Sequence, residues 1–272
     1  MNVNEVLSQL HELPAIPVVV QELMVAFDTS DVDMDDLARK ISRDQALFVK
    51  VLRVANSSFY GFPRKISSIH DAVVVMGMAG VRSLVLSAGF VHALGRDRRG
   101  ALDRDEYWKR SFRVASYAKV IAGCLKQSPE AGFTAGLLHD VGQIIAEICL
   151  PDRYAEVLAK AEADDGNLIV VEEEMLGFHH GTLGAEVARR WNFPLAIEHA
   201  IRDCHVLTGD VSDPLTIAVS MAVRIDRGDP PEQVLALLQP AVREVYGLNA
   251  DWLAANLPPR DQLEQGIADF LA

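Results

Sequence analysis

An apolar stretch between residues 133 and 148, F-T-A-G-L-L-H-D-V-G-Q-I-I-A-E-I, is interrupted by four polar residues: His139, Asp140, Gln143 and Glu147. Offsets of one, four and eight from the first residue place them in one stripe of a helix. A polar stripe on a buried helix must face other polar groups or water inside the protein. Histidine and aspartate can bind a divalent metal there, or donate and accept protons.

Two later histidines could face this stripe. His180 begins one row of apolar residues at helical spacing and His205 ends another, so both are expected at the ends of core-facing rows. Adjacent side chains on a helix diverge by about 100°. His139 and Asp140 can therefore share one metal only if other helices complete the shell. The alternative is a buried hydrogen-bonded network of these four residues with no ligand, and the residues alone leave both possibilities open.

The elements that must position these side chains are helices. Apolar residues recur at positions i, i+3, i+4 and i+7 from the first residues onward, and this pattern resumes after residue 104. One β-branched run, Leu168 to Val171, is short and isolated. The sequence therefore predicts an all-α protein. In its second half we expect helices over residues 107–125, 129–150, 152–163, 180–191 and 194–205.

A charged, glycine-containing stretch from Gly95 to Arg104 is the best candidate for a domain boundary. We expect it to be a solvated connector. The resulting division is an N-terminal helical subdomain (1–95), a connector (96–104), a helical bundle (105–228) and a C-terminal helical extension (229–272).

The best membrane candidate runs from Ala72 to Leu94, but Arg82 divides it into two pieces that are each too short to span a bilayer. The predicted structure there is a pair of buried helices that meet at Gly77 and Gly80, and no membrane partner is expected.

The charge balance and the cysteines restrict the classes of partner and location. The 272 residues include 26 Lys and Arg against 38 Asp and Glu, a net charge of −12, which argues against nucleic acid as a partner. Cys124, Cys149 and Cys204 are far apart and form no C-x-x-C pair. The N-terminus lacks the features of a signal peptide. These observations predict a cytoplasmic protein.

At G-L-L-H-D-V-G (136–142) the sequence resembles the HD phosphohydrolase superfamily, whose His-Asp doublet and neighbouring His and Asp residues bind divalent metal and hydrolyse phosphoesters. Three further motifs narrow the resemblance to the HDOD family, the HD-related output domain of bacterial signalling proteins. They are L-P-A-I-P (13–17), R-V-A-N-S-S-F-Y-G-F-P-R-K-I-S-S-I (53–69) and G-F-H-H-G-T-L-G-A-E-V-A-R-R-W-N-F-P-L-A-I (177–197). The resemblance covers residues 6–228 and implies an N-terminal helical subdomain followed by an HD-like helical bundle.

The resemblance can be carried over residue by residue. His139 and Asp140 match the doublet, and His180 matches the histidine that follows a Gly-Phe turn. His205 matches the second member of a His-His pair whose first place is taken by Cys204.

Three positions depart from the pattern of active HD enzymes. The first metal histidine falls at Arg110, the last metal aspartate falls at Val223, and the lysine of H-D-x-G-K falls at Gln143. Arginine is a permanent cation that would repel a metal and pair with Asp140, and valine offers no donor atom. We therefore expect a degenerate site in which an Arg110–Asp140 charge pair, hydrogen-bonded to a neighbouring histidine, fills the volume of a metal. The alternative for Arg110 is a surface position facing solvent.

The predicted function is a non-catalytic cytoplasmic signalling or regulatory module that binds protein partners, with no catalytic residue, cofactor or metal expected. Two alternatives stay open. One is a metal-dependent phosphohydrolase or cyclic-dinucleotide phosphodiesterase that holds a divalent metal on His139, Asp140, His180 and His205, although the G-Y-P signature of HD-GYP enzymes is absent. The other is a nucleotide or anion receptor in which Arg110 binds a phosphate without cleaving it.

Overall fold

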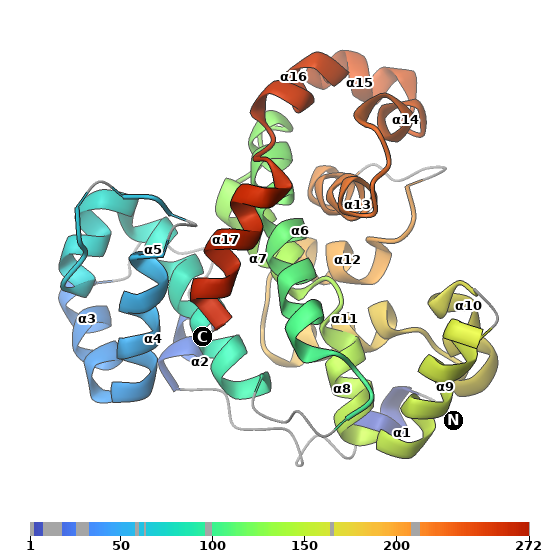
Figure 1. Ribbon diagram of the computed structural model, residues 1–272, viewed down its shortest axis with the longest axis horizontal. Coiled ribbons are helices and arrows are strands. Elements are labelled where there is room, and N and C mark those ends of the chain that lie inside the picture. The colour runs from blue at the N-terminus through green and yellow to red at the C-terminus, as the bar shows by residue number, and fades with distance from the viewer. Residues whose placement is uncertain are drawn as a thin grey trace.

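The computed structural model describes residues 3–7, 18–25, 33–57, 60–62, 64–95, 100–163, 166–207 and 213–271. Within these ranges every regular element is a helix (Figure 1), so the all-α prediction is confirmed. The isolated run from Leu168 to Val171 begins a helix instead of forming a strand. The L-P-A-I-P motif (13–17) and residues 96–99 of the expected connector lie outside the described ranges.

The helices of the N-terminal part are α1 (Val3–Leu7), α2 (Val18–Val25), α3 (Met34–Arg43), α4 (Gln45–Ala55) and α5 (Ile69–Leu94). Aspartates fix two of these starts: the Asp33 carboxylate accepts from the backbone at the first turn of α3, and the Asp44 carboxylate accepts from Leu47 N of α4. Helices α2 to α4 pack against one another and against α5, whereas α1 lies against the bundle near α11 (Figure 1).

Helix α5 is bent within its 26 residues. Ser68 caps its start, and Gly77 has φ +74° and ψ 166°, so the helical path breaks there. The two helices predicted to meet at a glycine corner are therefore observed, with the break at Gly77. By length and composition alone α5 could cross a bilayer. Its second half, from Gly80 to Leu94, lies mostly inside the folded chain.

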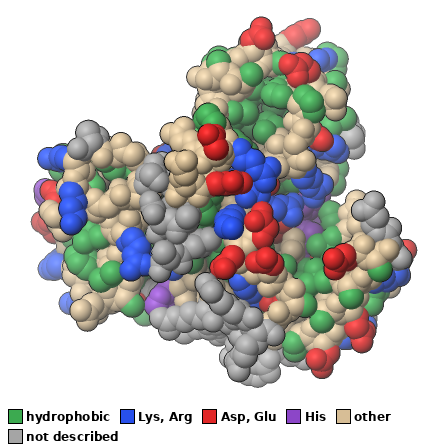
Figure 2. Space-filling model, viewed as in Figure 1, with side chains coloured by type: hydrophobic (Ala, Val, Ile, Leu, Met, Phe, Trp, Pro, Cys, Tyr) green, Lys and Arg blue, Asp and Glu red, His purple; other side chains and the backbone are tan. Residues whose placement is uncertain are grey.

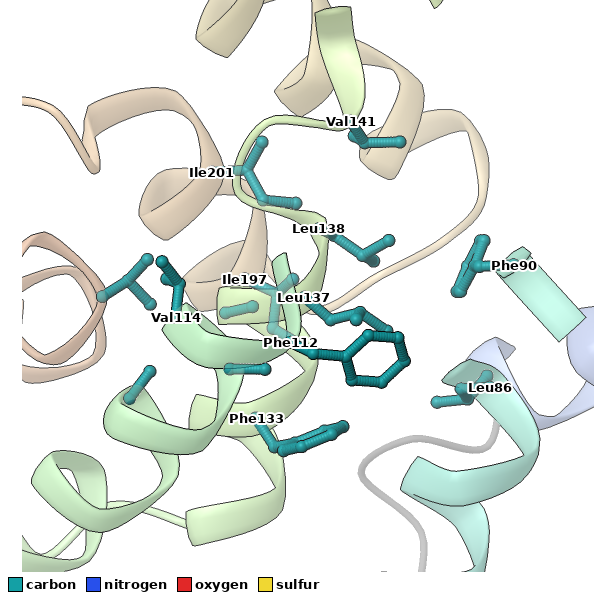
Figure 3. Close-up of a cluster of buried hydrophobic side chains, with 14 of the residues drawn as sticks. Leu86, Phe90, Phe112, Val114, Phe133, Leu137, Leu138, Val141, Ile197 and Ile201 are labelled. Atoms are coloured by element: carbon teal, nitrogen blue, oxygen red, sulfur yellow. The ribbon is translucent and has the colours of Figure 1, made fainter. Parts of the chain in front are cut away.

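The bundle helices are α6 (Arg104–Cys124), α7 (Pro129–Leu138), α8 (Val141–Cys149), α9 (Pro151–Ala163), α10 (Leu168–Leu176), α11 (His180–Arg190), α12 (Leu195–Asp203) and α13 (Pro214–Asp226). Helix α6 packs between α7 and α13, and α11 packs between α8 and α12. Buried side chains from both parts of the chain belong to one cluster. In Figure 3, Leu86 and Phe90 of α5 face Phe112, Leu137 and Leu138 of the bundle. The N-terminal helices and the bundle therefore share one hydrophobic core.

The described end of the predicted connector is solvated at Gly100, Ala101 and Asp103, as expected, but its last residue, Arg104, is buried and anchored. Arg104 is 5% exposed, and its Nη2 lies 2.5 Å from Oε2 of Glu147 on α8. Its Nη1 donates to the Leu94 carbonyl at 3.2 Å, and Leu102 N donates to Glu147 Oε1 at 2.6 Å. The prediction of a solvated side chain is wrong at Arg104, because a buried carboxylate 43 residues away supplies a partner for its charge.

The C-terminal helices are α14 (Pro231–Ala236), α15 (Pro240–Tyr246), α16 (Ala250–Asn256) and α17 (Arg260–Leu271). They form an arc, from which α17 returns to contact α6 and α4 (Figure 1). A buried ion pair supports this return: Arg113 Nε on α6 lies 2.6 Å from Asp226 Oδ1, and Arg260 Nη1 of α17 donates to the Asp226 carbonyl at 3.2 Å. The closing helix thus packs back onto the bundle.

Candidate functional site

His139 and Asp140 lie at a break between two helices. A single helix was expected over residues 129–150, but α7 ends at Leu138 and α8 begins at Val141. Asp140 has φ −108° and ψ 14°, which is outside the helical region. On a straight helix the two side chains would diverge. The break lets the His139 ring and the Asp140 carboxylate lie side by side.

A glycine brings α8 close to the start of α11. A Cβ atom added to Gly142 would lie 1.9 Å from the carbonyl oxygen of His180 and 2.9 Å from the backbone nitrogen of Gly184. Only a residue without a side chain fits this close approach. Gly142 therefore allows the start of α8, next to the break at His139 and Asp140, to lie against His180 at the start of α11.

The Asp140 carboxylate is the centre of the site. Its Oδ2 lies 3.2 Å from His139 Nε2 and 3.3 Å from Arg110 Nη1. Its Oδ1 lies 3.2 Å from His180 Nε2 and 3.0 Å from His205 Nε2. Asp140 is 1% exposed. Burial alone would raise its pKa, but the adjacent His139 ring, the charge of Arg110 and the hydrogen bond of His180 hold the pKa of Asp140 well below its ordinary value.

His180 lies between two carboxylates. Its Nδ1 lies 2.6 Å from Glu172 Oε2, and its backbone nitrogen donates to the same oxygen at 2.9 Å. The other oxygen of Glu172 accepts from the Tyr154 hydroxyl at 2.8 Å. Although burial lowers the pKa of His180, Asp140 and Glu172 raise that pKa to about 9. His180 is therefore a cation near neutral pH, with one proton on each ring nitrogen.

His205 is held in the opposite state. Burial lowers its pKa to about 4 against the attraction of Asp140. Arg227 Nη2 donates to His205 Nδ1 at 3.3 Å, so the proton of this neutral ring is on Nε2, which faces Asp140 Oδ1. The Nε2 atoms of His180 and His205 are 2.9 Å apart. Two imidazoles in different charge states thus meet at one carboxylate oxygen.

His139 has a nitrogen with no hydrogen-bond partner. Its Nδ1 donates to the Gly136 carbonyl at 2.7 Å, and its ring is wholly buried. Nε2 lies near Asp140 but forms no hydrogen bond of acceptable geometry. An orphaned buried nitrogen of this kind is expected where a ligand belongs.

The donor atoms fit one metal ion. Asp140 Oδ1, His180 Nε2 and His205 Nε2 lie 2.9 to 3.2 Å from one another. This is close to the spacing of about 3 Å between neighbouring ligands on an ion with bonds of about 2.1 Å. His139 Nε2 is available as a fourth donor. Metal-binding histidines commonly donate their other ring nitrogen to a carboxylate, which orients the ring. Glu172 makes this contact with Nδ1 of His180.

Cys204 lies within reach of the same space. Its sulfur, the Asp140 carboxylate and a nitrogen of His205 are mutually within 4.8 Å. The thiol faces the carbonyl oxygens of His139 at 3.7 Å and Ile201 at 3.4 Å. Burial raises the pKa of Cys204 well above its ordinary value, so the sulfur keeps its proton.

The three positions that depart from the HD pattern also have defined places. Arg110 on α6 turns its guanidinium toward Asp140 and is 29% exposed, so it is neither a free surface residue nor wholly buried. Val223 on α13 is buried and supplies no donor, and Gln143 is buried in the first turn of α8. The structure thus gathers Arg110, His139, Asp140, His180 and His205, with Cys204 beside them.

Three residues of the site were not predicted from the sequence: Tyr154, Glu172 and Arg227. Glu172 is the first of three consecutive glutamates in L-I-V-V-E-E-E-M-L, and nothing in that run distinguishes the buried one. Tyr154 lies in a charged helix that carries no other sign of a site. Arg227 follows the last residue of α13, four positions after Val223. Residues four apart lie on the same face of a helix, so this spacing could have placed Arg227 near the site.

Comparisons with known proteins agree with this architecture. A family model described as the HDOD domain matches residues 13–207. The crystal structure of a candidate phosphohydrolase from Shewanella amazonensis has a TM-score of 0.79 and 27% identity over 98% of each chain. An HDOD domain protein with unknown function from Geobacter sulfurreducens gives 0.75 and 25%, covering 99% of this chain and 94% of that one. An uncharacterized protein of Treponema pallidum is 26% identical over 238 residues, which are 83% of this chain and only 45% of that protein's length.

Proposed function

The chain belongs to the HDOD domain family, and from this membership and the geometry of its site we propose that it is a regulatory signalling module that binds partners and does not hydrolyse phosphoesters. The observation that carries the proposal is the contact of 3.3 Å between Arg110 Nη1 and Asp140 Oδ2. A guanidinium is permanently charged and cannot ligate a metal. It lies at the position that the HD pattern gives to the first metal histidine.

The charge of the site supports this proposal. Arg110, Arg227 and the protonated His180 supply three positive charges, and Asp140 and Glu172 supply two negative ones. The cluster is thus close to neutrality, with an excess of one positive charge, before any ion is added. A divalent cation would have to displace the Nε2 proton of His180 and would then lie beside an arginine, which is electrostatically unfavourable.

The partners of the proposed module are signalling proteins, and its proposed location is the cytoplasm. The wide spacing of Cys124, Cys149 and Cys204 in the sequence and the absence of a C-x-x-C pair support this location. The net charge of −12 favours protein or small-molecule partners over nucleic acid and anionic lipid.

A second candidate function is a single-metal phosphohydrolase. The convergence of donor atoms on one space favours it, as does the name of the Shewanella amazonensis structure. His139, Asp140, His180 and His205 would hold the ion, which would supply an activated water and polarise a phosphoryl oxygen. In that case Glu172 orients His180, and Arg110 neutralises charge on the substrate.

One experiment decides between the two candidates. Protein purified without chelator is analysed for transition metals and is assayed against bis(p-nitrophenyl) phosphate and a cyclic dinucleotide, with and without Mn²⁺. We expect far less than one equivalent of metal and no turnover above that of the His139→Ala variant. A stoichiometric metal, together with Mn²⁺-dependent turnover that His139→Ala abolishes, would contradict the proposal and establish the second candidate.

A further inference from the structure

Arg110 uses only part of its guanidinium. Its Nη1 faces Asp140, whereas its Nε and Nη2 are buried and have no hydrogen-bond acceptor. A buried donor without an acceptor costs free energy, and the cost is larger for a charged group. Two such atoms on one side chain indicate that an acceptor belongs beside them.

A second arginine lies at the same place with no carboxylate of its own. Within the part of the chain that the structure describes, the polar contact of Arg227 is the one it makes through Nη2 with the neutral ring of His205. Partial burial and the charge of Arg110 both lower the pKa of Arg227, as expected when two guanidinium groups share one region.

The carboxylates around these arginines are already engaged. Asp140 faces three histidines as well as Arg110, and Glu172 is taken by His180 and Tyr154. Arg224 shows the contrast, because this arginine in the last turn of α13 pairs with Asp229 at 3.2 Å. Figure 2 shows Lys and Arg side chains near the middle of the view, intermixed with Asp and Glu side chains and with a histidine nearby.

We propose that Arg110 and Arg227 form an anion site at the mouth of the histidine cluster, which takes the phosphoryl group of a small ligand. Arginine is suited to this group because its planar fork donates two parallel hydrogen bonds to tetrahedral oxyanions. The phosphoryl oxygens would accept from Nε and Nη2 of Arg110 and would balance the positive charge of the cluster. This inference rests on the proposed function, since the ligand is held by arginine and is not cleaved.

Both free phosphate and a nucleotide carry a phosphoryl group that could occupy this site. The ligands in the test are chosen to distinguish the two. Thermal melting and isothermal titration are run on metal-free protein with inorganic phosphate, adenosine 5′-monophosphate and adenosine, against sodium chloride of equal ionic strength. We expect phosphate and the nucleotide to raise the melting temperature and adenosine to leave it unchanged, because a ligand that binds only the folded state stabilises it.

Substitutions localise the binding. Arg110→Gln and Arg227→Gln should each weaken binding by at least about tenfold, since each removes a charge-assisted contact. Arg189→Gln is the control, because Arg189 is an exposed arginine of α11 that pairs within its own helix with Glu186, and it should bind like the wild type. If Arg110→Gln does not fold, Arg227→Gln still tests the site, because Arg227 lies at the surface just after the last residue of α13.

Three results would overturn the inference: no stabilisation by phosphate or nucleotide beyond that of chloride, equal binding by the wild type and both arginine variants, or binding that requires added Mn²⁺. Hydrolysis is measured in the same samples. Absence of binding without hydrolysis refutes this inference alone, whereas Mn²⁺-dependent hydrolysis refutes the proposed function.

Discussion

Arg110 on α6 and Asp140 at the start of α8 face each other through Nη1 and Oδ2, 3.3 Å apart, and Asp140 also contacts three histidines. One carboxylate thus faces both the guanidinium of Arg110 and the protonated ring of His180. A buried charge is tolerated only when it is paired and hydrogen-bonded. The stability of the bundle therefore depends on Asp140.

Replacing this carboxylate should be strongly destabilising. Asp140→Ala leaves Arg110 and the protonated His180 without their shared counter-charge, and loss of one partner of a buried pair costs about 3–5 kcal/mol. The control is Asp203→Ala, which removes an exposed partner of Arg202 and should cost less than about 1 kcal/mol. Urea unfolding followed by circular dichroism measures both changes. Equal losses for the two variants would contradict the central place of Asp140.

Glu172 should maintain the charge of His180. In Glu172→Gln the side chain keeps its size and loses its charge, so the pKa of His180 should fall from its value of about 9 toward the ordinary 6.5. The adjacent Glu173→Gln is a matched control, because Glu173 is exposed. NMR titration of the histidine ring protons reports the pKa directly. An unchanged His180 titration in Glu172→Gln would show that this carboxylate does not set the charge.

The stability of metal-free protein should depend on pH through His180 and His205. The pKa of His180 is raised to about 9, so its contribution is complete below about pH 6.5 and is lost as the pH rises through 9. The pKa of His205 is lowered to about 4, so its contribution is complete above about pH 6.5 and is lost as the pH falls through 4. The part of the stability that comes from this pair is therefore largest near pH 6.5.

Melting temperatures measured from about pH 4 to pH 9 test this dependence. Relative to the wild type, His180→Gln should flatten the alkaline side of the profile and His205→Gln the acidic side. Identical slopes in all three proteins would mean that other groups control the pH dependence.

Restoring the HD pattern should create metal affinity. The double variant Arg110→His and Val223→Asp removes the cation beside Asp140 and adds a carboxylate one turn before Arg227, with imidazole and carboxylate as donors. We expect it to bind Mn²⁺ or Zn²⁺ more tightly than the wild type by at least about tenfold, as measured by isothermal titration. The single variant Val223→Asp is the control, because it keeps Arg110. Affinity equal to that of the wild type would show that these two positions do not limit metal binding.

Gly142 should tolerate no side chain. In Gly142→Ala the new methyl group would lie 1.9 Å from the His180 carbonyl, so α8 and α11 must separate, at a cost of about 2 kcal/mol or more. In contrast, the nearest atom to an added Cβ at Gly123 is 3.6 Å away, so Gly123→Ala should be neutral or slightly stabilising. Thermal melting of the two variants provides the comparison. A stable Gly142→Ala protein would show that the helices can move apart freely.

Much of the architecture could be predicted because it follows from local patterns. Apolar periodicity gave the helices, and the caps at Asp33, Asp44 and Ser68 are local hydrogen bonds between a side chain and the following turn. The meeting of His139, Asp140, His180 and His205 was anticipated because each of them ends or interrupts an apolar row.

The remaining features depend on partners far away in the chain. The break at His139 and Asp140 replaces a continuous helix although the residues there fit the helical pattern, because packing against α11 decides the local path. Which of three adjacent glutamates is buried depends on the position of His180. The burial of Arg104 depends on Glu147, which no local pattern can reveal.

The pair of Arg104 and Glu147 has a mechanical meaning as well as an energetic one. Helix α8 is nine residues long, about 13 Å, with Asp140 at its start and Glu147 in its last turn. Arg104 also donates to the last carbonyl of α5, so the end of the N-terminal helices is tied to α8. A helix this short moves as a rigid unit. A displacement of Arg104 would therefore move Glu147, and with it α8 and Asp140. Such a displacement would change the position of Asp140 relative to the three histidines.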